Sequence, residues 1–320
     1  MCPPDEVALR ESTRNKLEDR PGLSPALTMI KDLERNPPAD YPTAKIRPLE
    51  WLLRSVEYME DELMDKGRSG RVGGGEGEVL DGDRSWGQVT ALENYKFHFQ
   101  RLRMVAKELI MQNFSYGGNI STTSIEIVER LTRYWIIFQH HLNANEDFVR
   151  DDGKQNTEQL TNTLVPLQEN YKYAHMLGQP ALCAHEAEFQ AYGVLLTGDL
   201  KQALKGGVGV SRSPEVRLAV DVLTCVETDN FARFFSLLRR APYLPGCLMA
   251  KYVERMREKA LEVWGRAYNP TKARGTAFRT ADVLRALCMQ DEDELKALAV
   301  SRPWVVVDGD RPASLPRLFA

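Results

Sequence analysis

The chain has 320 residues, of which 43% are hydrophobic and 27% are charged, and its formal net charge is −3. This composition predicts a soluble globular protein of roughly two domains, and the small negative charge excludes a global attraction to nucleic acid. No apolar run approaches the ~20 residues that a membrane helix needs, so we expect no membrane contact. Five widely spaced cysteines without a C-x-x-C pair predict reduced thiols, hence a cytosolic or nuclear protein.

The first predicted region is residues 1–45, where seven prolines interrupt helices repeatedly. We expect an extended N-terminal segment with short helical pieces that lies over the surface of the helices after it. A firm helix is predicted after Pro48, because apolar residues between Leu49 and Leu63 recur at helical spacing. The Gly-rich stretch 67–85 is expected to be a flexible loop.

Helical periodicity returns over residues 86–112 and continues in successive segments to residue 268. Ser121 or Thr122 is an expected N-cap, and Ser213-Pro214-Glu215 combines an N-cap, a proline at the first helical position and an acid in the first turn. The glycine cluster at 206–209 is expected to be a loop. Helical hairpins stacked side by side predict a superhelical body over residues 46–268, although no literal repeat is present.

Residues 269–320 have a different pattern from the rest of the chain. Two short helices are predicted, from Phe278 to Leu287 and from Glu292 to Ala299. Val305–Val307 is a β-branched run, and residues 315–319 could pair with it after a turn. The order helix, helix, strand, turn, strand predicts a winged-helix unit at the end of an otherwise all-α chain.

The sequence contains no recognisable catalytic constellation. His185-Glu186 could begin the zinc-binding motif H-E-x-x-H, but Phe189 stands where the second histidine of that motif would be needed. The glycine clusters lack the G-K-[ST] ending of a phosphate loop, and no serine stands in G-x-S-x-G. We therefore expect a non-enzymatic protein with no catalytic residue, metal, cofactor or small-molecule substrate.

Positive charge is concentrated in one part of the chain. Between Arg233 and Arg285 there are twelve basic and four acidic residues, in a chain whose total is −3. Such a local excess beside a winged helix favours contact with a phosphate backbone, and a solvated, ion-paired helix face is the alternative. The leading candidates flank Gly275 in a predicted connector: Lys272, Arg274 and Arg279. Further candidates, which could equally serve helix pairing, are Arg255, Arg257 and Lys259.

Ordered motifs along nearly the whole chain resemble the Sac/GANP family of messenger-RNA export proteins. The matching stretches are Met1-Cys2-Pro3 with Thr13-Arg14-Asn15, Ile46–Leu49 with Ser55–Tyr58, His185–Tyr192 with Leu195-Leu196, Ser213–Val216, Asn230–Phe235, Tyr243-Leu244 and Arg257–Leu261. One departure is the family's D-R-T-R-A-I-R-x-D run, which residues 100–108 keep only in part.

The resemblance implies a scaffold subunit of a nuclear transcription-and-export (TREX-type) complex, located at the nuclear pore. It implies a PCI-like helical body capped by a winged helix, paired with a second PCI-domain protein and a small acidic stabilising subunit. The two winged helices would then form a platform for RNA.

Two alternatives remain open at this point. One is a PCI-type interaction adaptor without RNA binding, such as a short centrosome-associated paralogue or a subunit like those of the proteasome lid. The other is an enzyme whose site has no recognisable motif.

Overall fold

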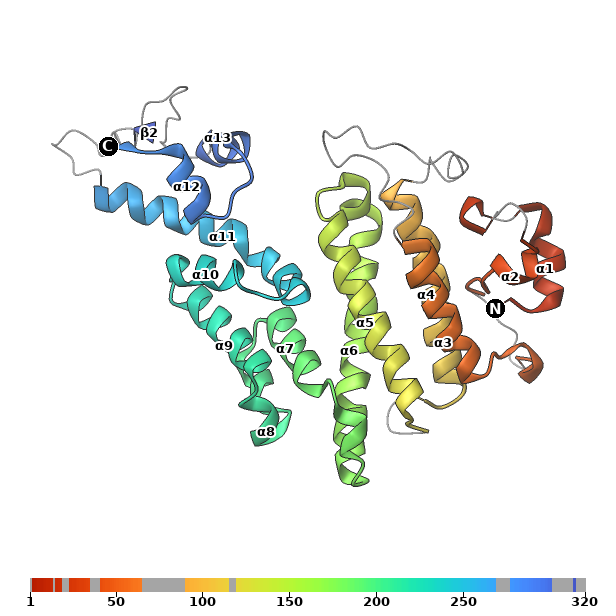
Figure 1. Cartoon of the computed structure of the whole chain (residues 1–320). Helices are drawn as coiled ribbons and strands as arrows, with labels where there is room; N and C mark the ends of the chain where they lie inside the picture. Colours follow the sequence, from red (N-terminus) through yellow and green to blue (C-terminus); the bar gives the residue numbers. More distant parts are fainter. Residues whose placement is uncertain are drawn as a thin grey trace. The chain divides into compact units, whose positions relative to one another are not determined.

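The structure is a computed structural model, and it describes residues 2–13, 15–18, 23–34, 41–64, 90–114, 119–268, 277–300 and 313–314. Across these residues the fold is helical apart from one pair of two-residue strands (Figure 1), so the prediction of an all-α fold is confirmed. The chain divides into two compact units, Met1–Glu186 and Ala187–Ala320, called the first and second unit below. This division falls inside the predicted helical-repeat body 46–268.

The N-terminal segment of the first unit is built from short helical pieces, as expected. They are α1 (Pro4–Arg10), η1 (Glu11–Thr13), η2 (Lys16–Glu18), α2 (Pro25–Thr28) and η3 (Thr43–Lys45). Pro4 and Pro25 each stand at a helix start, where a missing N–H costs nothing. Leu17, Met29 and Ile30 are fully buried, so this segment contributes to the core as well as covering it.

Four long helices form the body of the first unit and lie side by side in Figure 1. They are α3 (Leu49–Tyr58), which continues into the π-turn η4 (Met59–Leu63), α4 (Ala91–Met111), α5 (Thr122–Leu142) and α6 (Gly153–Met176), which follows the π-turn η7 (Phe148–Asp152). Ser121 caps α5 through a reciprocal box with Ser124, so the expected N-cap is confirmed. Tyr95 lies at the centre of the core, with its ring 5.0–5.3 Å from Phe99, Phe138 and Phe148.

The second unit continues with shorter helices before one long one. They are α7 (Glu186–Thr197), which begins at the last residue of the first unit, then η9 (Leu200–Leu204), α8 (Gly207–Ser211), α9 (Pro214–Glu227), α10 (Phe231–Leu238) and α11 (Tyr243–Tyr268). Ser213 accepts a hydrogen bond from the Val216 amide, which confirms the predicted cap of α9. The expected loop at 206–209 is wrong: Gly207, at φ +76°, turns the chain directly into a short helix.

The C-terminal elements only partly follow the predicted pattern. They are β1 (Ala277–Phe278), α12 (Thr280–Ala286), α13 (Glu292–Val300) and β2 (Ala313–Ser314), with β1 antiparallel to β2. The two helices are confirmed, but Phe278 belongs to a strand and its ring stacks on Trp264 at 6.0 Å. The predicted strands at Val305–Val307 and 315–319, like the loop 67–85, lie outside the described residues. The PCI-like superhelix and the winged helix stay predictions.

Candidate nucleic-acid interface and N-terminal pocket

Arg257 lies on α11 and holds the end of α12. Its guanidinium donates to the carbonyls of Leu287 at 3.1 Å and Cys288 at 2.6 Å, and it pairs with Glu294 of α13 at 2.5 Å. The side chain is only 13% exposed. A cation at a helix C-terminus satisfies carbonyls that have no partner within the helix, and it interacts favourably with the helix dipole. The structure therefore gives this candidate RNA-binding residue a role in packing.

Arg255 and Lys259 share one carboxylate, that of Asp229 in the turn between α9 and α10. The Arg255 guanidinium lies 3.7 Å from it and the Lys259 ammonium 3.2 Å. Asp229 adopts φ +53°, a conformation that Asp tolerates better than most residues. Its hydrogen bond and charge raise the pKa of Lys259 above the ordinary value. Both cations are accessible, yet part of their charge is already compensated.

Arg279 is the N-cap residue of α12 and is exposed. Its side chain makes no ion pair with any residue that the structure describes. Arg285, in the last turn of α12, is exposed and equally free of ion pairs within the described ranges, although it was not among the candidates. Lys272 and Arg274 lie outside the described residues.

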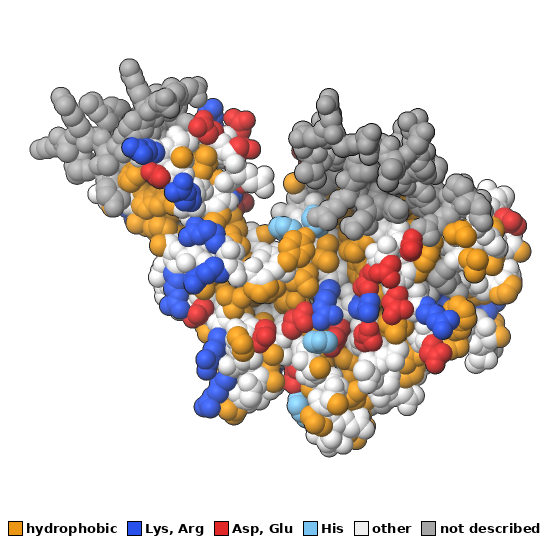
Figure 2. Space-filling model, viewed as in Figure 1, with side chains coloured by type: hydrophobic (Ala, Val, Ile, Leu, Met, Phe, Trp, Pro, Cys, Tyr) orange, Lys and Arg blue, Asp and Glu red, His pale blue; other side chains and the backbone are white. Residues whose placement is uncertain are grey.

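A second group of exposed cations was missed by the sequence analysis. It comprises Lys201, Lys205, Arg212 and Arg217, and none of them is ion-paired in the described part of the chain. They belong to or flank η9, α8 and α9, which pack on one another. Figure 2 shows Lys and Arg side chains gathered along one edge of the second unit. The signal was present in the sequence, because Glu215 is the only acid between residues 201 and 217.

The first unit contains a buried cluster of charges that the sequence analysis also missed. Glu108 of α4 is fully buried, and its two oxygens contact the Lys31 ammonium at 2.6 Å and the Arg47 guanidinium at 2.7 Å. Glu18 is likewise buried and bridges Arg10 at 2.8 Å and Arg101 at 3.1 Å. Lys107 also donates to the Glu34 carbonyl at 2.6 Å, so three charged positions of the segment 100–108 bind the N-terminal segment.

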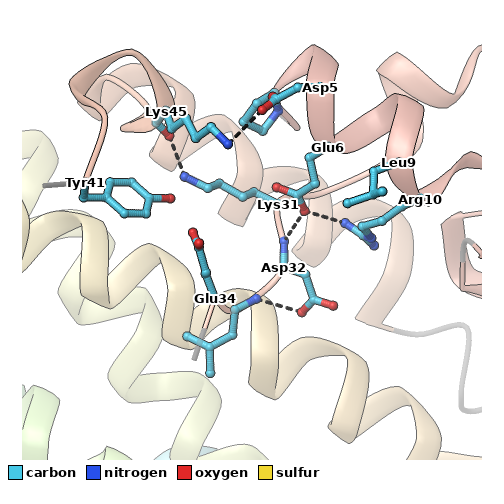
Figure 3. Close-up of a pocket in the computed structure, with 11 residues that line it drawn as sticks. Asp5, Glu6, Leu9, Arg10, Lys31, Asp32, Glu34, Tyr41 and Lys45 are labelled. Carbon is cyan, nitrogen blue, oxygen red and sulfur yellow. Dashed lines mark hydrogen bonds and ion pairs between the residues drawn. The ribbon is translucent and has the colours of Figure 1, made fainter. Parts of the chain in front are cut away.

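A polar hollow of about 360 Å³ opens beside this cluster (Figure 3). Asp5 pairs with Lys45 at 2.9 Å, and Glu6 pairs with Arg10 at 2.8 Å and accepts from the Asp32 amide at 3.0 Å. The hydrogen bond from Lys45 holds the pKa of Asp5 below its usual value. The acids and bases of the wall therefore pair mainly with one another, an arrangement suited to fastening the segment.

Among the described residues, no helix is both long enough and apolar enough to cross a membrane. The site thus consists of two helical units, one fastened by buried ion pairs and the other with an edge of exposed cations that have no ion pair within the described ranges.

Comparison with known proteins identifies the family. Residues 1–303 match the SAC3/GANP family, and the chain belongs to it. The motif resemblance is thereby confirmed, and this family is one of scaffold-type proteins.

Three relatives show how the match extends. Protein xmas of Drosophila melanogaster is 27% identical over 314 residues, which cover 92% of this chain and 14% of the relative. SAC3 family protein B of Arabidopsis thaliana is 28% identical over 284 residues, covering 82% and 15%. SAC3 family protein A of the same plant is 43% identical over 56 residues, covering 18% and 6%. The chain spans about a seventh of the length of the first two.

Proposed function

We propose that this chain is a non-catalytic scaffold of a nuclear, TREX-type messenger-RNA export complex. In this proposal it pairs with a second PCI-domain protein and a small acidic stabilising subunit at the nuclear pore, and its second unit contacts RNA. Membership of the SAC3/GANP family supports the scaffold role. The RNA contact rests on exposed cations of the second unit that have no ion-pair partner among the described residues, in a chain with net charge −3. They are Lys201, Lys205, Arg212, Arg217, Arg279 and Arg285.

Unpaired cations matter because RNA affinity at physiological salt comes largely from the release of counterions by phosphate contacts. A cation that already has a carboxylate partner must give up that ion pair to bind phosphate, so its net contribution to RNA affinity is smaller. Among the cations of the second unit, we propose Lys272, Arg274 and Arg279 as phosphate contacts. Arg279 is exposed without an ion pair among the described residues, whereas Lys272 and Arg274 lie outside those residues and are proposed from the sequence. Arg255 and Lys259 contribute less to RNA affinity because both contact Asp229. Arg257 contributes indirectly, by holding the end of α12 and pairing with Glu294.

The test is titration of a fluorescent single-stranded RNA with the chain, followed by anisotropy. The variant carries Lys272→Glu, Arg274→Glu and Arg279→Glu. A control with the same charge change carries Lys96→Glu, Arg150→Glu and Lys172→Glu, which are exposed, ion-paired residues of the first unit. We expect the first triple variant to weaken binding by at least about tenfold and the control to change it far less.

Equal loss in both variants would show that net charge, rather than this surface, controls binding. No RNA binding by the wild-type chain would favour the adaptor without RNA binding.

Partner binding is tested separately by affinity purification from nuclear extract. Recovery of a second PCI-domain protein and a small acidic subunit supports the scaffold proposal. Recovery of centrosomal or proteasome-lid proteins in their place would support the alternative adaptor roles.

A further inference from the structure

Three potential metal ligands converge at the end of the first unit. They come from three successive elements: His175 from the last turn of α6, Cys183 from the short turn η8 (Pro180–Cys183) and Glu186 from the first position of α7. Their nitrogen, sulfur and oxygen ligand atoms all lie within 4.8 Å of one another. The closest pair is His175 Nε2 and Glu186 Oε2, at 2.6 Å.

The local backbone explains this convergence. Gly178 adopts φ +66° just after α6, which stops the helix and sends the chain into η8. The thiol of Cys183 is half-buried and donates to the Tyr171 carbonyl on α6 at 3.6 Å. Glu186 has a side chain only 7% exposed, whereas that of His175 is 49% exposed. The cluster therefore has a buried floor and an accessible side.

We propose that His175, Cys183 and Glu186 bind one zinc ion. Zinc takes imidazole nitrogen, thiolate sulfur and carboxylate oxygen in a tetrahedron, whose ligand atoms are roughly 3–4 Å apart given the usual metal–ligand distances. The separations in the structure, from 2.6 Å to at most 4.8 Å, lie within about 1 Å of that range. The fourth position would be filled by water from the accessible side. Calcium and magnesium fit poorly, because both prefer oxygen ligands alone.

The neighbouring groups favour these three ligands over the adjacent His185. The ring of His185 binds Glu129 at 2.7 Å, and the other oxygen of Glu129 accepts from the Tyr171 hydroxyl at 2.6 Å. His185 is thus held on a different carboxylate, although it stands next to Glu186 in the sequence. The H-E-x-x-H spacing did not reveal the cluster, because its histidine is His175, eleven residues before Glu186.

The proton balance makes binding depend on pH. Cys183 binds zinc only as the thiolate, so its thiol must lose a proton on binding. Zinc binding replaces that proton, which goes to solvent, and the imidazole binds through Nε2 with its remaining proton on Nδ1. Affinity therefore falls as pH falls. The bound ion would link the last turn of α6 to the first residue of α7 and stabilise that connection, a role beyond the proposed export function.

The test is titration of the purified, metal-free chain with Co²⁺, a spectroscopic substitute for zinc. We expect visible bands of tetrahedral Co²⁺ and a near-ultraviolet thiolate-to-cobalt band that saturate at one equivalent and are bleached by Zn²⁺. The thiolate band should vanish in Cys183→Ser, and the tetrahedral bands in His175→Gln. Matched controls are Cys2→Ser, also half-buried, and His185→Gln, and both should bind as wild type does.

A second measurement separates loss of binding from loss of folding. Zn²⁺ should raise the melting temperature of the wild-type chain and of both controls, and leave that of His175→Gln unchanged. The far-ultraviolet circular dichroism of His175→Gln should remain that of wild type. The proposal is overturned if the wild-type chain shows no thiolate band, or if that band survives Cys183→Ser. Neither outcome would bear on RNA binding.

Discussion

At the scale of single residues, the buried charges of the first unit matter most for its stability. Glu108 is fully buried, and the side chains of its partners Lys31 and Arg47 are only 3% and 6% exposed. Burying such charges is costly, so the cluster persists only because every charge has a close partner. The Lys31 contact spans 77 residues and ties the N-terminal segment to α4, and the Arg47 contact spans 61 residues and ties the start of α3 to the same carboxylate.

Glu108→Gln should therefore destabilise the first unit strongly. The substitution keeps the shape but leaves two buried cations without their carboxylate, at an expected cost of about 3–5 kcal/mol. The measurement is hydrogen exchange of the α5 amides. Glu169→Gln is the control, because Glu169 forms an exposed pair with Lys172 in the same unit, and it should cost less than about 1 kcal/mol. Similar losses in both variants would contradict a fastening role for the buried cluster.

His98 should make the first unit sensitive to acid. Burial in the aromatic core lowers its pKa from 6.5 to about 4, against the opposing effect of the Asn94 and Met59 carbonyls and with a further lowering by Arg101. Below pH 6.5 the His98 imidazole becomes protonated in the unfolded chain but stays neutral in the folded chain, so acid favours unfolding. Stability is thus lost between pH 6.5 and about 4, on the order of 3 kcal/mol in total.

The variant that isolates this effect is His98→Leu. Its free energy of unfolding, from α5 hydrogen exchange at pH 7 and pH 5, should decrease less with acid than that of the wild-type chain. An unchanged pH dependence would place the acid sensitivity in other groups.

At the scale of elements, α12 is short and depends on arginines from other helices. Arg239, the C-cap residue of α10, donates to the Arg285 carbonyl at 3.1 Å, and Arg257 donates to the next free carbonyls. A helix of seven residues is unstable alone, so these caps and its packing define where it ends.

Arg257→Ala should accelerate hydrogen exchange throughout α12 and α13. Loss of two charged hydrogen bonds and of the Glu294 pair is expected to cost about 2–3 kcal/mol. Arg255→Ala is a control on the same helix, because its side chain is 61% exposed and its ion pair is long, and it should cost less than about 1 kcal/mol. If Arg255→Ala has the larger effect, the packing role of Arg257 is wrong.

Elements governed by local chemistry were predictable from the sequence. The caps at Ser121 and Ser213 fixed two helix starts, because a hydroxyl satisfies a nearby amide regardless of the rest of the fold. Helix α8 was not predictable from the sequence. Gly207, at positive φ, is the first residue of this helix, whereas a cluster of glycines ordinarily indicates a loop. The strand at Phe278 depends on a partner 35 residues away, at Ala313, which local periodicity does not reveal.

At the scale of the whole molecule, charge counting located the basic region but could not say which cations are free. Arg257 and Arg279 contribute equally to the count, yet one caps a helix and the other is exposed without an ion pair among the described residues. That distinction depends on contacts between distant segments. The buried cluster around Glu108 escaped prediction for the same reason, because its partners are dispersed in the sequence.

The distinction between paired and unpaired cations leads to a prediction about salt. For single-stranded nucleic acid, the slope of log K against log salt concentration changes by about 0.7 for each phosphate contact. Lys201 and Arg217 have no ion pair in the part of the chain that the structure describes. Neutralising both, by Lys201→Ala and Arg217→Ala, should therefore reduce the slope for RNA by about 1 to 1.5. Neutralising two exposed but paired residues, by Arg233→Ala and Arg266→Ala, should leave it nearly unchanged, because Asp221 and Glu262 already compensate them. Equal slopes for the two variants, measured by anisotropy over a range of salt concentrations, would mean that pairing in the free chain does not decide which cations contact phosphate.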